Sequence, residues 1–213
     1  MRQALEKLLV QSVSSRTVFV VFNLAGANLA GKNLSRLSLQ EKDLAGTDLT
    51  GADLTGADLT RATLTGADLT RATLTGADLT RAHLVLATLI RANLHGATLA
   101  DADLLGANLG KAVMRAARLI KTNLANADLS ETNLTGADLA GAILTGANLV
   151  GANLAGAVLH GVNLNNATWS DTTVWPTLET FEIMQGTSDR LEDGSYRVRS
   201  TPSDDRYWAS SFA

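Results

Sequence analysis

The residues that could carry catalysis or metal binding are few in this chain. It contains no cysteine and three histidines, His83, His95 and His160. Without cysteine there can be no disulfide, thiolate nucleophile or cysteine-ligated metal site. The motifs GxSxG, HExxH, CxxC and GxxxxGK(S/T) are all absent, so no serine hydrolase, zinc peptidase or phosphate-binding loop is indicated. We therefore expect a protein that is not an enzyme and that uses neither a cofactor nor a metal.

Composition and charge argue against two further classes of partner. The chain has 213 residues, of which 46% are hydrophobic and 18% charged, and its net charge is −3. This charge is too small to indicate direct binding to nucleic acid or to a membrane surface. No run of 18 apolar residues occurs, and the apolar stretch Val18–Phe22 is shorter than the core of a secretory signal. A cytoplasmic location without membrane contact is expected.

The sequence repeats with a period of five residues, and this period predicts the elements that position the side chains. Counting from Leu24 in steps of five reaches Val174 without a slip, and Leu occupies all 31 positions except Met114, Trp169 and Val174. Ala stands two residues earlier in 22 of the 31 units. In a helix this spacing would distribute the Leu side chains around the whole circumference. Gly and Thr between the Leu positions favour turns, so each pentapeptide is predicted to be one short side of a coil with its Leu inside.

The repeated unit resembles that of a known family. The segment Ala52–Gly56 has the pattern A(D/N)LxG, which resembles the pentapeptide-repeat family over about residues 19–176. The resemblance implies an all-β solenoid, a right-handed quadrilateral β-helix of about 7 to 8 coils with four pentapeptides per coil. Residues 20 apart then stack in columns. The three histidines fall in different columns, which agrees with the absence of a metal site.

The ends of the chain are predicted to cap this column. We expect an N-terminal helical cap at residues 1–16, the β-helix at 17–176, and a C-terminal cap helix and tail at 177–213. In the C-terminal segment, Leu178, Phe181 and Met184 are expected on one face of a short helix that stops at Gly186. A hairpin is expected around Asp193–Gly194.

Aromatic residues are confined to these ends, where a stacked coil would expose its last layer. They are also candidates for mediating a homodimer. The nine residues are Phe19, Phe22, Trp169, Trp175, Phe181, Tyr196, Tyr207, Trp208 and Phe212.

Two lysines conflict with the inward Ala position of the repeat. Lys32 and Lys42 stand where most units have Ala, and an unpaired buried ammonium would be costly. Either the first coil is distorted or the side chains escape at its end. We expect distortion, because Leu37 and Thr47 also depart from Ala.

Basic residues form two columns on the implied geometry. Arg61 and Arg81 share one column, and Arg71, Arg91 and Lys111 share the opposite one. Binding of an anion or an acidic partner is the functional interpretation. Solubility and edge protection are the alternative, because neighbouring carboxylates could offset these charges. The carboxylates considered are Asp58, Asp68 and Asp78.

The repeat is least regular between His83 and Lys121, where apolar residues replace Thr, Gly or Ala at outer positions. Val85 is expected to stack beneath Leu105, with Leu86 at the adjacent corner and Ile90 on the next face. A contiguous apolar patch suggests a contact surface. Neutral drift in a tolerant scaffold is the alternative.

Two functions follow from these features. The first is a non-enzymatic protein–protein interaction scaffold or regulator with a protein partner of unknown identity. The second is implied by the family resemblance: mimicry of duplex DNA to bind and protect DNA gyrase. Duplex DNA carries one negative charge per about 1.7 Å, whereas residues 23–174 contain 13 acidic and 11 basic side chains. Mimicry could therefore only be local, through the aspartates that encircle one coil, which are Asp43, Asp48, Asp53 and Asp58.

Overall fold

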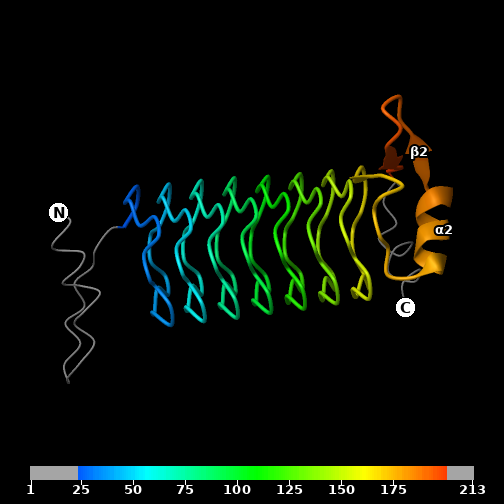
Figure 1. Ribbon diagram of the computed structural model, residues 1–213. Coiled ribbons are helices and arrows are strands. Elements are labelled where there is room, and N and C mark those ends of the chain that lie inside the picture. The colour runs from blue at the N-terminus through cyan, green and yellow to red at the C-terminus, as the bar shows by residue number, and fades with distance from the viewer. Residues whose placement is uncertain (1–23, 201–213) are drawn as a thin grey trace, which may run out of the picture.

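The computed structural model describes residues 24–200 and shows a column of stacked coils with a small cap at its C-terminal end (Figure 1). Parallel β-bridges join residues 20 apart, such as Asn28 with Asp48 and Asp48 with Asp68. Four pentapeptides therefore complete each coil. The predicted N-terminal helical cap, residues 1–16, lies outside the described residues.

The segment Ala52–Gly56 shows how one repeat satisfies its own backbone. Four of its five N–H groups donate to backbone carbonyls, one within the preceding corner and three in neighbouring coils. The fifth, of Thr55, donates to Asp53 Oδ1 at 3.0 Å. An Asp or Asn in the middle of a unit thus completes the hydrogen bonding of its corner. This role explains the preference for these residues without any reference to function.

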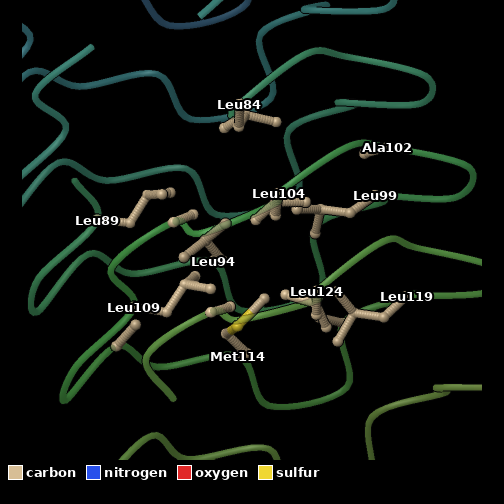
Figure 2. Close-up of a cluster of buried hydrophobic side chains, with 14 of the residues drawn as sticks. Leu84, Leu89, Leu94, Leu99, Ala102, Leu104, Leu109, Met114, Leu119 and Leu124 are labelled. Carbon is tan, nitrogen blue, oxygen red and sulfur yellow. The ribbon is translucent and has the colours of Figure 1, made fainter. Parts of the chain in front are cut away.

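The interior is a packed stack of Leu and Ala side chains (Figure 2). Figure 2 shows Leu84, Leu94 and Leu104 pointing inward, with Met114 filling the place of one Leu. The buried polar residues of the column are threonines in the small, Ala position, and their hydroxyl groups donate to Leu carbonyls. They are Thr47, Thr122, Thr132 and Thr173.

Each unit ends in a tight corner of two residues. Ala57 N donates to Leu54 O at 3.0 Å, and the second corner residue, Gly56, has a φ of 62°. This is the geometry of a type II turn, which favours Gly at that position. Asn tolerates this conformation, whereas other side chains are strained by it.

The four faces of the column are numbered by the outward residue in the middle of each unit. Faces 1 and 2 begin at Asn28 and Asn33, faces 3 and 4 begin at Ser38 and Asp43, and each continues at every twentieth residue. A corner is named by the two faces that it joins. Corner 4/1, for example, follows face 4 and precedes face 1.

The repeat phase is broken once, near the end of the column, so the prediction of an unbroken phase to Val174 is wrong. Val174 bridges Asn153, which is 21 residues away rather than 20. One residue is therefore inserted after Trp169. Val174 takes an outward position and is 46% exposed, while Trp175 takes the inward position. The hydroxyl of Thr173 closes the wider corner by accepting from Ser170 N at 3.0 Å.

The cap contains one helix and a three-stranded antiparallel sheet. The elements are β1 (Thr168–Trp169), α2 (Leu178–Gly186), β2 (Ser188–Arg190) and β3 (Tyr196–Val198), and the sheet order is β1-β3-β2. The predicted helix and hairpin are confirmed.

The apolar residues predicted to share one face of α2 differ in burial. Leu178 is 73% exposed, whereas Met184 is buried. Leu178 is the first residue of the helix, directly after the N-cap Thr177, and so lies at the rim of the cap.

Four aromatic side chains form the centre of the cap. Trp169 is fully buried, stacks on Tyr196 with 4.4 Å between ring centroids, and meets Trp175 and Phe181 edge to face. Its Nε1 donates to Ser188 Oγ at 2.9 Å. These rings are engaged within the chain. The aromatic residues outside the described range are Phe19, Phe22, Tyr207, Trp208 and Phe212.

The first coil is regular, so the expected distortion at its lysines is wrong. Lys32 N donates to Leu29 O and Asp53 N donates to Lys32 O, as in later units. Lys42 makes the equivalent bonds. Both side chains are half-buried, so neither lysine is enclosed in the core.

Candidate protein-binding surface

Three apolar residues of corner 4/1 form one surface, here called the apolar ridge: Val85, Leu86 and Leu105. Val85 and Leu86 are the two corner residues of one coil, and Leu105 lies beside Val85 in the next coil, since Leu86 N donates to Leu105 O at 2.9 Å. The Leu86 side chain lies over Gly106, because a Cβ at Gly106 would be 2.9 Å from Leu86 Cδ2. Leu86 is therefore on the same corner as Val85, and its expected place at an adjacent corner is wrong.

Leu86 is unfavourable for the stability of the fold in two ways. Its side chain is 67% exposed, and its backbone has a φ of +57°. The equivalent second corner residues of the neighbouring coils, Gly66 and Gly106, adopt this conformation at no steric cost because Gly has no Cβ. In the part of the chain that the structure describes, Leu86 is the one large apolar residue with a positive φ.

Ile90 is not part of the ridge. It is the first residue of corner 1/2, is half-buried, and is separated from Leu86 by the unit of face 1 that contains Thr88. The structure thus brings together three of the four apolar residues predicted to act as one patch. Ile90 instead lies next to Arg91 on the basic side of the molecule.

The basic residues lie in the two predicted columns, at second corner positions, but their acidic partners differ from those expected. On corner 3/4, Arg61 pairs with Glu41 at 3.3 Å and Arg81 pairs with Asp101 at 3.8 Å. Each partner belongs to the same column, one coil away. No ion pair within residues 24–200 involves the expected partners Asp58, Asp68 and Asp78. The column of Arg61 and Arg81 is therefore of mixed charge.

The opposite column, on corner 1/2, retains more positive charge. Lys111 pairs with Glu131 at 3.4 Å, whereas Arg71 and Arg91 make no ion pair with another described residue. All three of these pairs are exposed, so each contributes little to stability.

Sequence reasoning missed an acidic strip that borders the ridge. Between residues 24 and 169, no Lys or Arg stands at the middle outward positions of faces 4 and 1 or at the two residues of corner 4/1. Sorting the charged residues by their position in the 20-residue coil would have found the strip. Its acidic members are Asp43 and Asp103 on face 4 and Asp48, Asp68 and Asp128 on face 1.

Hydrogen bonds hold these carboxylates in fixed positions. Asp68 Oδ1 accepts from Thr70 N at 2.9 Å, and Asp103 Oδ1 accepts from Leu105 N at 3.2 Å. In Asp48 the equivalent bonds from the backbone and side chain of Thr50 lower the pKa below its ordinary value of 3.8. Asp48 is therefore ionised at neutral pH, and backbone hydrogen bonds hold the carboxylates of Asp68 and Asp103 in place.

The described residues contain neither a cluster of metal ligands nor a helix that could span a membrane. Between residues 24 and 200 no group of three or more His, Asp or Glu side chains could hold a metal ion. Nor does any helix in this range have the length and apolar character needed to cross a membrane. The features that distinguish the surface are the ridge, the acidic strip and the basic corners.

Comparison with known proteins places the chain in a family. The family profile described as pentapeptide repeats matches in eight copies, at residues 23–56, 67–104, 99–136 and 132–168. The chain belongs to the pentapeptide repeat family. No catalytic activity is indicated by this membership, which is typical of structural and interaction proteins. No curated protein matched the chain.

Solved pentapeptide repeat proteins resemble this member of the family. One is HetL from the cyanobacterium Nostoc sp. strain PCC 7120, described as involved in heterocyst differentiation regulation. The match has 33% identity and a TM-score of 0.46, and covers 71% of this chain and 78% of HetL. A trypsin-treated variant of QnrB1, a plasmid-mediated fluoroquinolone resistance protein, is 20% identical with a TM-score of 0.53, and the match covers 66% of this chain and 78% of that one. At this identity QnrB1 supports the shared fold alone.

Proposed function

We propose that this protein is a non-enzymatic protein–protein interaction scaffold or regulator that binds its partner through the apolar ridge. The supporting column is a right-handed β-helix of about 7 to 8 coils at 20 residues per coil. Within the described residues the column runs from residue 24 to about 176, and residues 177–200 cap its C-terminal end.

Leu86 is the observation that carries this proposal. A left-handed conformation costs an L-residue about 1–2 kcal/mol, and exposing a Leu side chain forfeits the burial energy that inward Leu residues gain. Both costs fall on one residue of corner 4/1, where the equivalent second corner positions of the other described coils hold Gly or Asn. Thirteen other non-Gly residues between 24 and 200 also have a positive φ, but none of them is a large apolar residue. Strain that local structure does not require is typical of functional positions. Leu105 and Val85 extend the same surface, as a contact site requires.

Affinity capture from a lysate of the source organism tests this function. The wild type is compared with a triple variant, Val85→Thr, Leu86→Gly and Leu105→Thr. Each substitution introduces a residue that already stands at the equivalent position of corner 4/1 in another coil, such as Thr65 for Val85, so we expect the fold to be retained. Ile143→Thr is the matched control, because Ile143 is 42% exposed on face 4 but lies away from the ridge. A protein retained by the wild type and the control but not by the triple variant supports the proposal. Equal retention by all three contradicts it.

Local DNA mimicry is the second candidate. It is favoured by the four aspartates that encircle one coil, which are Asp43, Asp48, Asp53 and Asp58. Hydrogen bonds from Thr50 and Thr55 lower the pKa of Asp48 and Asp53, respectively, so these carboxylates are ionised. The test is whether the protein protects the supercoiling activity of gyrase from a quinolone. Protection by the wild type and by the triple ridge variant, but not by an Asp48→Asn, Asp53→Asn variant, would support mimicry in place of the ridge.

A further inference from the structure

The charges around the apolar ridge are arranged in bands. The ridge lies on corner 4/1, which carries no charged residue between residues 25 and 166. One aspartate lies on the face to either side, Asp103 beside Leu105 on face 4 and Asp68 one coil before Leu86 on face 1. The other middle positions next to the ridge are His83, Thr88 and Asn108. Basic residues begin only at the next corners, with Arg81 on corner 3/4 and Arg91 on corner 1/2. The carboxylates nearest to the ridge are therefore those of Asp103 and Asp68, and the Arg residues lie one corner further out.

The acidic band is linked directly to the ridge. Asp103 Oδ1 accepts the N–H of Leu105, one of the ridge residues, and also accepts from Asn123 Nδ2 at 2.9 Å. On the other side, Asp68 bridges Thr88, which lies in the unit that follows Leu86. Both carboxylates are fixed by their backbone bonds, so pairing with a partner would require little loss of side-chain freedom.

Shape and charge together define what can cover this surface. The ridge is the convex edge between two faces, so the complementary surface is concave and apolar. The carboxylates on either side favour cations at both borders of that concavity, where complementary charges increase specificity and association rate. Polyanions such as nucleic acids and acidic lipid surfaces are repelled by the same carboxylates.

Building on the proposed function, we propose that the partner is a protein with an apolar groove bordered on both sides by Lys or Arg residues. The ridge residues Val85, Leu86 and Leu105 enter the groove. The basic borders pair with Asp68 and Asp103. The outer basic corners then face acidic or neutral parts of the partner, which restricts binding to one orientation.

Substitution of Asp by Asn tests the charge term without disturbing the fold. Asn already occupies the middle of many units, and Asn93 Oδ1 accepts the corner N–H of His95 at 3.1 Å as Asp does elsewhere. The test variant is Asp68→Asn, Asp103→Asn. The matched control is Asp58→Asn, Asp78→Asn, which removes two charges from face 3, opposite face 1.

The probe is a phage-displayed library of protein fragments from the source organism. Fragments are selected on the full-length wild type and depleted on the Leu86→Gly variant, and their dissociation constants are measured at 50 and 500 mM NaCl. We expect ridge-dependent fragments with net positive charge and about tenfold weaker binding to the test variant at 50 mM NaCl. This loss should shrink at 500 mM NaCl because salt screens the charges, and the control variant should bind like the wild type.

The outcomes separate this inference from the proposed function. Ridge-dependent fragments that are neutral or acidic, or that bind the test variant as tightly as the wild type, would overturn the inference and leave the ridge as the binding surface. If no fragment distinguishes the wild type from Leu86→Gly, the proposed function itself fails. Basic fragments that lose affinity equally for the test and control variants would show a general charge effect and would also overturn the inference.

Discussion

At the scale of single residues, the pentapeptide separates structural from functional roles. The inward Leu, the small Ala and the middle Asp or Asn each meet a requirement of the coil, as the bonds of Asp53 with Thr55 show. Leu86 meets none of these requirements, because Gly serves the same corner at positions 66 and 106. A residue that is costly to the fold and unnecessary for it is the best indicator of function in a repeat protein.

Leu86→Gly is predicted to stabilise the column. Removing the side chain relieves the left-handed strain, worth about 1 kcal/mol, and costs little burial because Leu86 is 67% exposed. The free energy of unfolding in urea measures the change. Leu86→Ala is the control, since Ala keeps the strain, as Ala116 does with a φ of +53°. A Gly variant no more stable than the Ala variant would contradict the strain argument.

Acid is predicted to weaken the column through Asp48 and Asp53. Hydrogen bonds from Thr50 and Thr55, respectively, lower the pKa of these carboxyls in the folded protein below 3.8. Their contribution to stability is therefore present above the unfolded pKa and is lost as pH falls through the lower folded values. Melting temperatures measured from pH 7 to pH 2 should fall below about pH 4. The Asp48→Asn, Asp53→Asn variant should fall less steeply, and identical curves would contradict this account.

At the scale of elements, most of the column could be predicted because its signals are periodic. The Leu and Ala positions repeat without exception from residue 49 to residue 112, so their burial followed directly. The insertion after Trp169 could not be predicted, because Val174 suits both the inward position and an exposed edge. The half-buried state of Lys32 agrees with the alternative that the side chain escapes at the end of the coil, and the period of five alone did not distinguish this from distortion. The stacking of Val85 with Leu105 followed from the 20-residue coil, whereas the left-handed backbone of Leu86 was overlooked although it stands at a Gly position.

The C-terminal cap is predicted to depend on Trp169. This ring contacts Trp175, Phe181 and Tyr196 and bonds to Ser188. Trp169→Ala should destabilise the last coils and the cap by about 3–5 kcal/mol, as measured by hydrogen exchange across residues 149–198. Ser188→Ala removes only the hydrogen bond and should cost about 1 kcal/mol. Equal effects of the two variants would show that the ring cluster is not what fastens the cap.

At the scale of the whole molecule, the column presents long parallel bands of residues. Each coil contacts only its neighbours, so substitutions on the surface change one band and leave the others intact. The fold thus holds the ridge, the acidic strip and the basic corners at fixed spacing. A rigid surface of this kind favours binding with little ordering cost.

Site-specific photo-crosslinking in living cells tests the central claim most directly. A benzophenone amino acid replaces Leu86 in one strain and Ala116 in another, since Ala116 is also an exposed second corner residue with a positive φ but lies on corner 2/3, opposite the ridge. The account predicts that irradiation yields a defined crosslinked protein from position 86 and none from position 116. Crosslinking to the same protein from both positions, or from position 116 alone, would contradict the assignment of the ridge as the binding surface.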